Sequence, residues 1–249
     1  MMQLQQLLAS MDEWLEPWRY QDYAPNGLQI EGRAEVRHII TGVTASQALI
    51  DVAIARRADA ILVHHGYFWK GEDARLIGMK RARVAKLLQH DISLIAYHLP
   101  LDGHLELGNN ATLARRLGWQ AEGQAGEQGL LWHGRWPAAA TAAQLAEEIS
   151  VSLGRQAMLL GPAERPVRRL AWCTGGAQSF FQEAIRLGVD AFVTGEVSEQ
   201  CFHLAEEYGV AFIAAGHHVT ERYGVQALGE KVSHLPGITV EFVDLFNPV

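Results

Sequence analysis

Three apolar, strand-like runs of this chain each end in histidine, and a carboxylate follows two of them. The runs span residues 61–63, 93–97 and 210–216. The polar residues after them are His64, His65, His98, Asp102, His217, His218 and Glu221. Ligands bind beyond the carboxyl ends of the strands in open parallel sheets. We therefore expect these side chains to converge on one site.

The residue types at this expected site suit a metal. Neutral imidazoles and carboxylates bind zinc, manganese, iron or nickel, and no thiolate lies nearby. The six candidate ligands are His64, His65, His98, Asp102, His217 and Glu221. One catalytic zinc takes three protein ligands and a water, whereas six ligands suit two metals about 3.5–4 Å apart, bridged by a carboxylate and a water or hydroxide. The sequence thus predicts two divalent ions, with zinc, manganese, iron, nickel and magnesium all left open.

Local spacing gives expectations for the carboxylates. Pro100 interrupts a continuous helix, so we expect His98 and Asp102 on one loop. His217 and Glu221 are four residues apart, and a helix that begins near Thr220 could place them on the same side.

Other histidines have simpler interpretations. A single histidine at a strand end is usually a surface or hydrogen-bonded residue. We apply this interpretation to His38, His90, His104, His133, His203 and His234. Adjacent residues of an extended chain face opposite ways, so His218 stays open, whereas Gly66 after His65 permits a turn.

The elements around these residues follow an α/β pattern. Apolar positions recur at helical spacing over residues 46–57, between strand-like runs at 38–43 and 60–63. Near-continuous apolar strands joined by helices predict parallel pairing in an α/β layer fold.

A second copy of this strand–helix–strand unit stands in the other half of the chain. Residues 40–42, 46–48 and 58–61 have counterparts at 173–175, 178–180 and 189–192. This similarity predicts two related α/β lobes, although the same order is common in α/β proteins generally. Alignment of the copies places Glu196 opposite His65, which makes Glu196 a candidate for orienting a ligand or contacting a substrate.

The segment between the two copies has a different pattern of apolar residues. Residues 126–166 contain a short strand-like run, a capping-box helix from Thr141 to Gly154 and a second short run. We expect a small inserted domain at 126–166, and a discontinuous main domain of residues 1–125 plus 167–249.

Composition excludes several classes of protein. The formal charge of −7 argues against general binding to nucleic-acid backbones. No uncharged apolar run approaches the roughly 20 residues of a membrane span. Two cysteines are too few for a disulfide framework, so we expect a cytoplasmic protein.

Several motifs together resemble the GTP cyclohydrolase 1 type 2 homologue family, also called NIF-three-like, and in particular its short bacterial branch. They are residues 22–29, 41–44, 64–66, 98–102, 108–110, 194–196 and 216–221, in this order along the chain. The resemblance implies a two-lobed α/β fold, a dinuclear metal centre and a toroidal homohexamer. It places metal ligands at His64, His65, Asp102, His217 and Glu221, and a further active-site position at His98.

Two functions remain in view. The first is a metal-dependent hydrolase of a small nucleotide-like or phosphorylated substrate, with Glu221 bridging the metals and His98 or Glu196 relaying protons. The second is a non-enzymatic, metal-binding oligomer that serves as an interaction platform or handles metal.

Overall fold

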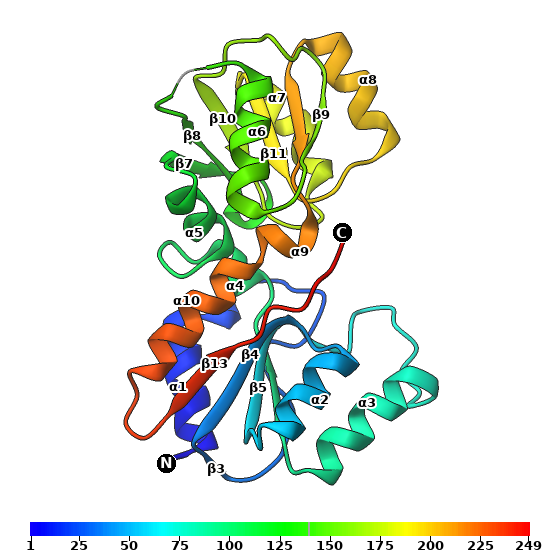
Figure 1. Ribbon diagram of the computed structural model, residues 1–249, viewed down its shortest axis with the longest axis vertical. Coiled ribbons are helices and arrows are strands. Elements are labelled where there is room, and N and C mark those ends of the chain that lie inside the picture. The colour runs from blue at the N-terminus through cyan, green and yellow to red at the C-terminus, as the bar shows by residue number, and fades with distance from the viewer. Residues whose placement is uncertain (139) are drawn as a thin grey trace. The chain divides into compact units, whose positions relative to one another are not determined.

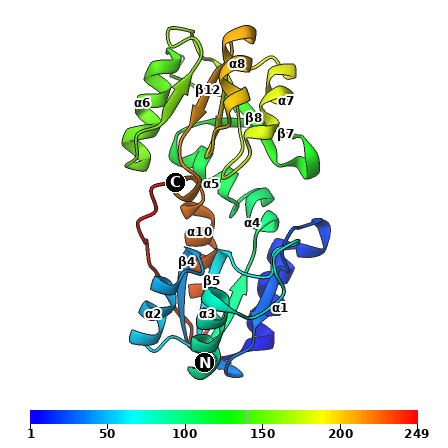
Figure 2. The same ribbon diagram turned by 90° about the vertical axis from the view of Figure 1, so that its right-hand side faces the viewer.

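The computed structural model describes every residue of the chain except Ala139. The chain forms two compact units, labelled by element in Figures 1 and 2. Unit 1 comprises Met1–Leu107 and Gly224–Phe246, and unit 2 comprises Gly108–Tyr223 and Asn247–Val249. No described helix is long and apolar enough to cross a membrane.

Unit 1 is built on a five-stranded sheet with the order β13-β4-β5-β6-β2. Its strands are β2 (Gly27–Ile30), β4 (His38–Thr44), β5 (Ala60–His65), β6 (Ser93–Ala96) and β13 (Thr239–Phe242). Its longer helices are α1 (Leu4–Leu15), α2 (Gln47–Ala55), α3 (Gly78–Gln89) and most of α10 (Arg222–Ser233). All neighbouring pairs are parallel except β2 with β6. Strands β1 (Met2–Gln3) and β3 (Glu35–Val36) form a separate two-stranded antiparallel sheet.

Helices cover both faces of this sheet, which explains why its central strands β4, β5 and β6 are mostly apolar. Successive strand residues face opposite ways. One face packs against α1 and α10 through Ile39, Leu62 and Ile95. The other face packs against α2 and α3 through Ile40, Ile61 and Leu94.

Unit 2 has a six-stranded sheet with the order β7-β8-β10-β11-β12-β9. Its strands are β7 (Gln120–Ala125), β8 (Leu131–Arg135), β9 (Met158–Leu160), β10 (Arg169–Trp172), β11 (Ala191–Thr194) and β12 (Ala211–Ala214). Its helices include α5 (Asn109–Arg116), α6 (Ala142–Leu153), α7 (Phe181–Arg186), α8 (Glu199–Tyr208) and α9 (His217–Thr220). The central strands β10, β11 and β12 are parallel. Helices α5 and α6 pack on one face and α7 and α8 on the other.

The predicted internal repeat is present as the parallel centre of each sheet. It comprises β4-α2-β5-α3-β6 in unit 1 and β10-α7-β11-α8-β12 in unit 2. The aspartate of the repeated Asp-Ala dipeptide makes equivalent hydrogen bonds in both copies. In each copy one carboxylate oxygen of the aspartate accepts two main-chain N–H groups at the start of the first strand of the repeat. The other carboxylate oxygen pairs with an arginine side chain. The donors are Arg37, His38 and Arg33 for Asp59, and Arg168, Arg169 and Arg165 for Asp190.

The two compact units differ from the division that the sequence suggested, residues 1–125 plus 167–249 with an insertion at 126–166. Strand β8 pairs with β10 and strand β9 with β12, so both strands of the 126–166 segment belong to the sheet of unit 2. The predicted capping box of this segment is present, since Thr141 and Gln144 bond each other's main chain at the start of α6.

Candidate metal centre

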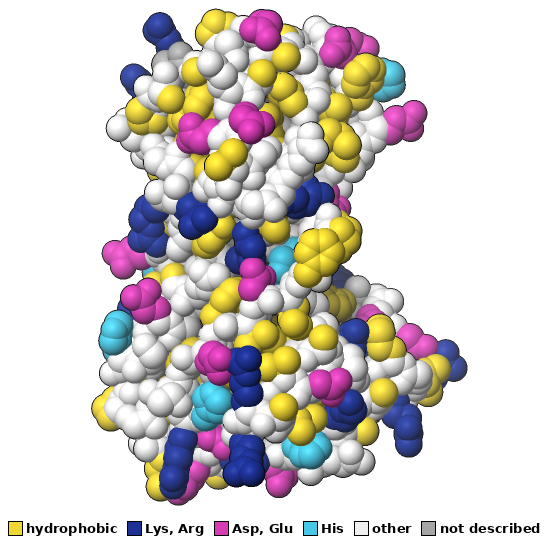
Figure 3. All heavy atoms as spheres, viewed as in Figure 1, with side chains coloured by type: hydrophobic (Ala, Val, Ile, Leu, Met, Phe, Trp, Pro, Cys, Tyr) yellow, Lys and Arg dark blue, Asp and Glu magenta, His cyan; other side chains and the backbone are white. Residues whose placement is uncertain are grey.

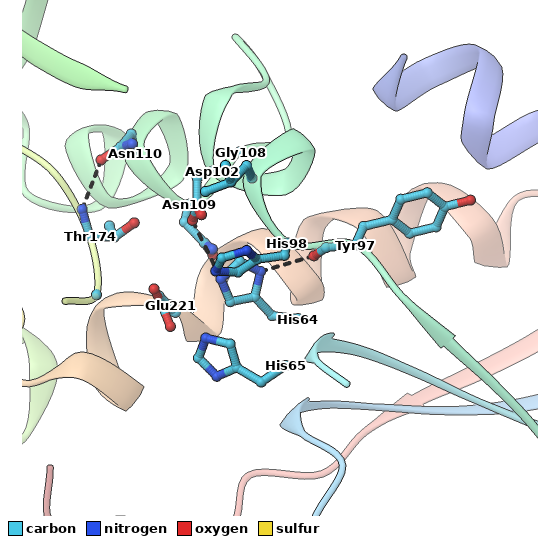
Figure 4. A network of polar contacts seen from close by, with 12 residues as sticks. His64, His65, Tyr97, His98, Asp102, Gly108, Asn109, Asn110, Thr174 and Glu221 are labelled. Atoms are coloured by element: carbon cyan, nitrogen blue, oxygen red, sulfur yellow. Dashed lines mark hydrogen bonds and ion pairs between the residues drawn. The ribbon is translucent and has the colours of Figure 1, made fainter. Parts of the chain in front are cut away.

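Three imidazoles gather at the carboxyl ends of two neighbouring strands in unit 1. His64 and His65 end β5, and His98 follows β6 by two residues. One ring nitrogen from each lies within 4.8 Å of the other two. Ring centroids are 4.5 Å apart for His64 and His65 and 5.1 Å apart for His64 and His98, and Figure 4 shows the three rings together. Parallel pairing of β5 with β6 is what brings these residues to one edge.

His64 is oriented by the main chain. Its Nδ1 lies 3.0 Å from the carbonyl oxygen of Tyr97, which can only accept, so Nδ1 carries the proton. Nε2 of the same ring lies 3.5 Å from Oδ1 of Asp102, and His64 is fully buried. A histidine whose one nitrogen donates to a carbonyl presents its other nitrogen as a metal ligand.

Asp102 reaches this cluster from a short helix, not from the loop that we expected. Helix α4 (Leu99–Gly103) begins directly after His98 and carries Pro100 in its first turn. Proline is tolerated there because the first N–H groups of a helix have no partner within it. The buried carboxylate of Asp102 therefore sits one helical turn beyond His98.

Two residues that the sequence analysis gave no role hold His98 in place. Asp22 contacts Nδ1 of His98 at 2.7 Å and accepts the main-chain N–H of Leu99 at 2.9 Å. Asn26 accepts the main-chain N–H of His98 at 2.7 Å. Burial alone would raise the pKa of Asp22, but the hydrogen bond and charge interaction with His98, together with hydrogen bonds from Asn26 and Leu99, outweigh burial. The net effect lowers the pKa to about 2. Asp22 is thus an anion that orients His98.

The turn after β5 is shaped by close packing. A Cβ atom at Gly66 would lie 2.1 Å from Oε1 of Gln29 and 2.7 Å from Cβ of Ala96. Gly66 is therefore required for its lack of a side chain, whereas we had expected it for its freedom to turn. Beyond it, the ring of Trp69 meets His98 edge-on with centroids 4.9 Å apart. The loop that follows Gly66 thus contacts the imidazoles through the ring of Trp69.

Unit 2 holds a second group, centred on His217. Its Nδ1 lies 2.7 Å from Oε1 of Glu196 and its Nε2 lies 3.0 Å from Oε2 of Glu221. Burial lowers the pKa of His217, but hydrogen bonds and charge interactions, first with Glu221 and then with Glu196, outweigh burial and raise the pKa to about 9. Helix α9 spans His217–Thr220, so it starts earlier than the helix we expected near Thr220, and Glu221 follows it directly.

A glycine makes room for Glu221. Gly175 has a φ of +69°, and a Cβ atom there would lie 2.0 Å from Oε1 of Glu221. The loop that contains Gly175 is held by Asn110, whose Oδ1 accepts the main-chain N–H of Thr174 at 3.0 Å (Figure 4). Gly175 itself donates its N–H to Oγ1 of Thr220 at 3.1 Å.

The remaining histidines lie apart from these groups. His218 is buried, and its main-chain N–H donates to a main-chain oxygen of Val249. Within the described part of the chain, no group of three metal-binding side chains includes His218 or any of His38, His90, His104, His133, His203 and His234.

The donor sets fit divalent first-row metals. Unit 1 offers three imidazoles and Asp102, and unit 2 offers His217 and Glu221. In each of these groups a histidine is oriented through its Nδ1 by a carboxylate, Asp22 for His98 and Glu196 for His217, as is usual for metal-binding histidines. The arrangement can bind metal and hold the ligand nitrogens in defined directions.

Comparison with known proteins gives consistent matches over the whole chain. The sequence profile of the family described as Duf34/NIF3 (NGG1p interacting factor 3) matches residues 2–247. A protein of Pseudomonas aeruginosa named GTP cyclohydrolase 1 type 2 homolog is 52% identical over 248 residues, which cover 98% of each chain. One of the same name from Yersinia pestis is 55% identical over 232 residues, 92% of each chain.

Solved structures share the fold. A structure titled protein ybgI, of unknown function, has 49% sequence identity, covers 100% of both chains and superposes with a TM-score of 0.96. The structure of the protein TTHA1606 from Thermus thermophilus has 32% identity, the same coverage and a TM-score of 0.88.

Proposed function

Because this chain belongs to the Duf34/NIF3 family, we propose that it is a dinuclear-metal hydrolase of a small nucleotide-like or phosphorylated substrate. The observation that carries the proposal is the gathering of the His64, His65 and His98 nitrogens within 4.8 Å at the strand ends of unit 1. Structural histidines are seldom grouped in this way, with their other nitrogens held by a carbonyl and a carboxylate.

We assign five residues as metal ligands. His64, His65, Asp102, His217 and Glu221 would hold the two ions, and the carboxylate of Glu221 would be shared between them. His98 is assigned to the same centre, as a ligand or as a proton-transfer group. The sequence suggested that Glu196 orients a ligand, contacts a substrate or relays protons. The first role is the best supported, because its carboxylate bonds Nδ1 of His217.

When bound, two divalent cations would lower the pKa of water and stabilise negative charge on the substrate. The chain's own groups supply orientation and proton transfer. Asp22 keeps Nδ1 of His98 protonated, so Nε2 is the atom of His98 that can accept or return a proton. The buried carboxylate of Asp102 and the carbonyl of Tyr97 restrict rotation of the His64 ring.

The proposed dinuclear centre is tested by the substitution Glu221→Gln. A neutral amide bridges two cations poorly and nearly keeps the shape of the side chain, so we expect the metal-to-protein ratio to fall by one ion while circular dichroism stays unchanged. His218→Ala is the control, because His218 lies outside the group, and it should keep the wild-type ratio. An unchanged ratio in Glu221→Gln contradicts the dinuclear centre.

Hydrolase activity needs a separate test. A panel of phosphoesters, nucleotides and pterin precursors would be assayed with Mn²⁺, Zn²⁺ and Mg²⁺. Turnover that disappears in Glu221→Ala supports the enzyme. If fully metal-loaded protein turns over none of these compounds, the non-enzymatic alternative, a platform or metal-handling oligomer, is favoured instead.

A further inference from the structure

A cavity of about 400 Å³ opens in unit 2 at the carboxyl ends of β11 and β12. Its lining includes Arg155, Met158, Gly195, Glu196, Val197 and Ala214. Gly195 directly follows β11, and Ala214 is the last residue of β12. This is the edge of a parallel sheet at which ligands bind in open α/β folds.

Arg155 is held in place at this cavity by main-chain oxygens. Its Nε and one terminal nitrogen donate to the carbonyl of Pro248, at 3.2 and 3.0 Å. The other terminal nitrogen donates to the carbonyl of Gln156 at 3.3 Å. The side chain also lies against the main chain of Gly216, where a Cβ atom would come within 2.6 Å of its Cδ. The guanidinium is therefore placed beside the residue that precedes His217.

The positive charge of Arg155 is not neutralised by these contacts. Carbonyl oxygens accept hydrogen bonds but carry no net charge. Among the described residues no carboxylate forms an ion pair with Arg155, and its contacts use three of the five N–H groups that a guanidinium has. The two remaining N–H groups and the charge suit an anionic oxygen group, for which arginine is the preferred partner.

Apart from Arg155 and Glu196, the side chains that line the cavity are uncharged. Met158, Val197 and Ala214 give it an apolar lining. Glu196 lines it as well, and its Oε1 is engaged by Nδ1 of His217 at 2.7 Å. One carboxylate thus connects the cavity to an assigned metal ligand. The volume is several times that of a phosphate group, so an organic part has room beside the apolar side chains.

We propose that this cavity is the substrate subsite and that it binds a small phosphorylated organic molecule, with the phosphate on Arg155 and the organic part against Met158, Val197 and Ala214. The assignment as a substrate subsite rests on the proposed function, because it takes His217 as part of the reaction centre. Binding of the phosphate group itself does not depend on that assumption.

The test measures binding of inorganic phosphate to the full-length, metal-stripped protein by equilibrium dialysis at constant ionic strength. Removal of metal ensures that phosphate is not held by the ions. We expect Arg155→Met, which keeps the apolar stem and removes the charge, to weaken phosphate binding at least 10-fold. Arg155→Lys should fall between Arg155→Met and the wild type, since it keeps the charge and loses the forked donors.

Arg116→Met is the matched control. Arg116 also belongs to unit 2 and donates to a carbonyl, that of Ser152 at 2.7 Å, but it does not line the cavity. Its substitution removes the same charge and should change phosphate affinity less than twofold. Equal phosphate binding by Arg155→Met and Arg116→Met overturns the proposal, and so does tighter binding of acetate than of phosphate by the wild type.

Metal content separates this proposal from the proposed function. Arg155→Met removes no assigned ligand, so after metal is restored it should hold as much as the wild type. A wild-type protein that holds no metal contradicts the proposed function and leaves Arg155-dependent phosphate binding as a separate result. If the protein holds its metal normally but phosphate binding does not depend on Arg155, the proposed subsite is wrong and the proposed function is not contradicted.

Discussion

Glu196 contacts His217, which we have proposed as a metal ligand. It accepts from Nδ1 of His217, which leaves Nε2 toward Glu221. We predict that Glu196→Gln lowers metal affinity about 10–100-fold, the usual cost of losing such a partner. Competition with a chromophoric chelator would measure it. Glu199→Gln, a matched change at the exposed start of α8, should leave the affinity unaltered, and an equal loss in both variants would count against the orienting role.

The lowered pKa of Asp22 predicts that the stability of the fold depends on pH. Its folded pKa of about 2 lies below the roughly 3.9 of an unfolded aspartate, so its ionised form stabilises the fold above about pH 4. This contribution, of order 2 kcal/mol, is lost as the pH falls toward 2. The free energy of unfolding of Asp22→Asn should therefore lie below that of the wild type at pH 6, and the two should converge near pH 2.

Asp73→Asn is the comparison for that experiment, because Asp73 pairs with Arg75 at the surface and such pairs contribute little. If Asp73→Asn destabilises as much as Asp22→Asn, or if the gap for Asp22→Asn does not close in acid, the role given to Asp22 is wrong.

These residues also show how far a sequence can predict a site. His64, His65 and His98 were predictable as a group because each lies at the end of an apolar strand or just after it, and neighbouring parallel strands end together. Asp22 was not, because its partner is 76 positions away and nothing local links them. Glu196 was found only through alignment of the two repeats. Its bond to His217 could not be predicted, because the fold brings together two residues that are 21 positions apart.

At the scale of elements, the loop after β10 is shaped around one side chain. Gly175 and Gly154 both have a φ of +69°, but a Cβ atom would meet Glu221 at the first and nothing within 4 Å at the second. Alanine at either position costs about 1–2 kcal/mol in left-handed backbone strain. We predict that only Gly175→Ala also displaces Glu221 and lowers the metal-to-protein ratio.

Elemental analysis and thermal unfolding of the two alanine variants would separate strain from displacement. A normal metal ratio in Gly175→Ala would show that Glu221 has room to move or is no ligand. Equal metal loss in both variants would show that strain alone is responsible.

The elements themselves were predicted unevenly. Strands and the helices between them followed from apolar spacing, and the Thr141 cap was readable because its partner Gln144 is three residues away. The short helices α4 and α9 were not. Pro100 is compatible with a first helical turn as well as with a loop, and four-residue α9 is too short for periodicity to reveal its start.

At the scale of the whole molecule, we expect the chain to assemble as the homohexamer that its family resemblance implies. Exposed apolar side chains remain on unit 1, including Leu76, Ile77 and Met79, which are 48–66% exposed. In the view of Figure 3, hydrophobic and charged side chains are interspersed over the surface. Light scattering should report about six times the chain mass of 27.5 kDa, and a monomer at micromolar concentration would contradict the prediction.

Of all features of the fold, the division into two units was the hardest to predict from the sequence. Texture suggested an insertion at residues 126–166, because that segment lacks long apolar strands. Antiparallel pairing of β8 with β10 and of β9 with β12 is a long-range choice that composition does not reveal. The repeat was visible because both copies need the same aspartate before their second strand.

The route of the chain has a consequence for synthesis. All six strands of unit 2 lie between residues 120 and 214, whereas the sheet of unit 1 takes its edge strand from Thr239–Phe242, paired with His38–Thr41. During synthesis, unit 2 can therefore complete its sheet before β13 has been made and can pair with β4. The sheet whose strands begin earlier in the chain is thus completed later, the reverse of the usual order in multidomain chains. During that interval an unpaired strand edge of unit 1 is available to other chains.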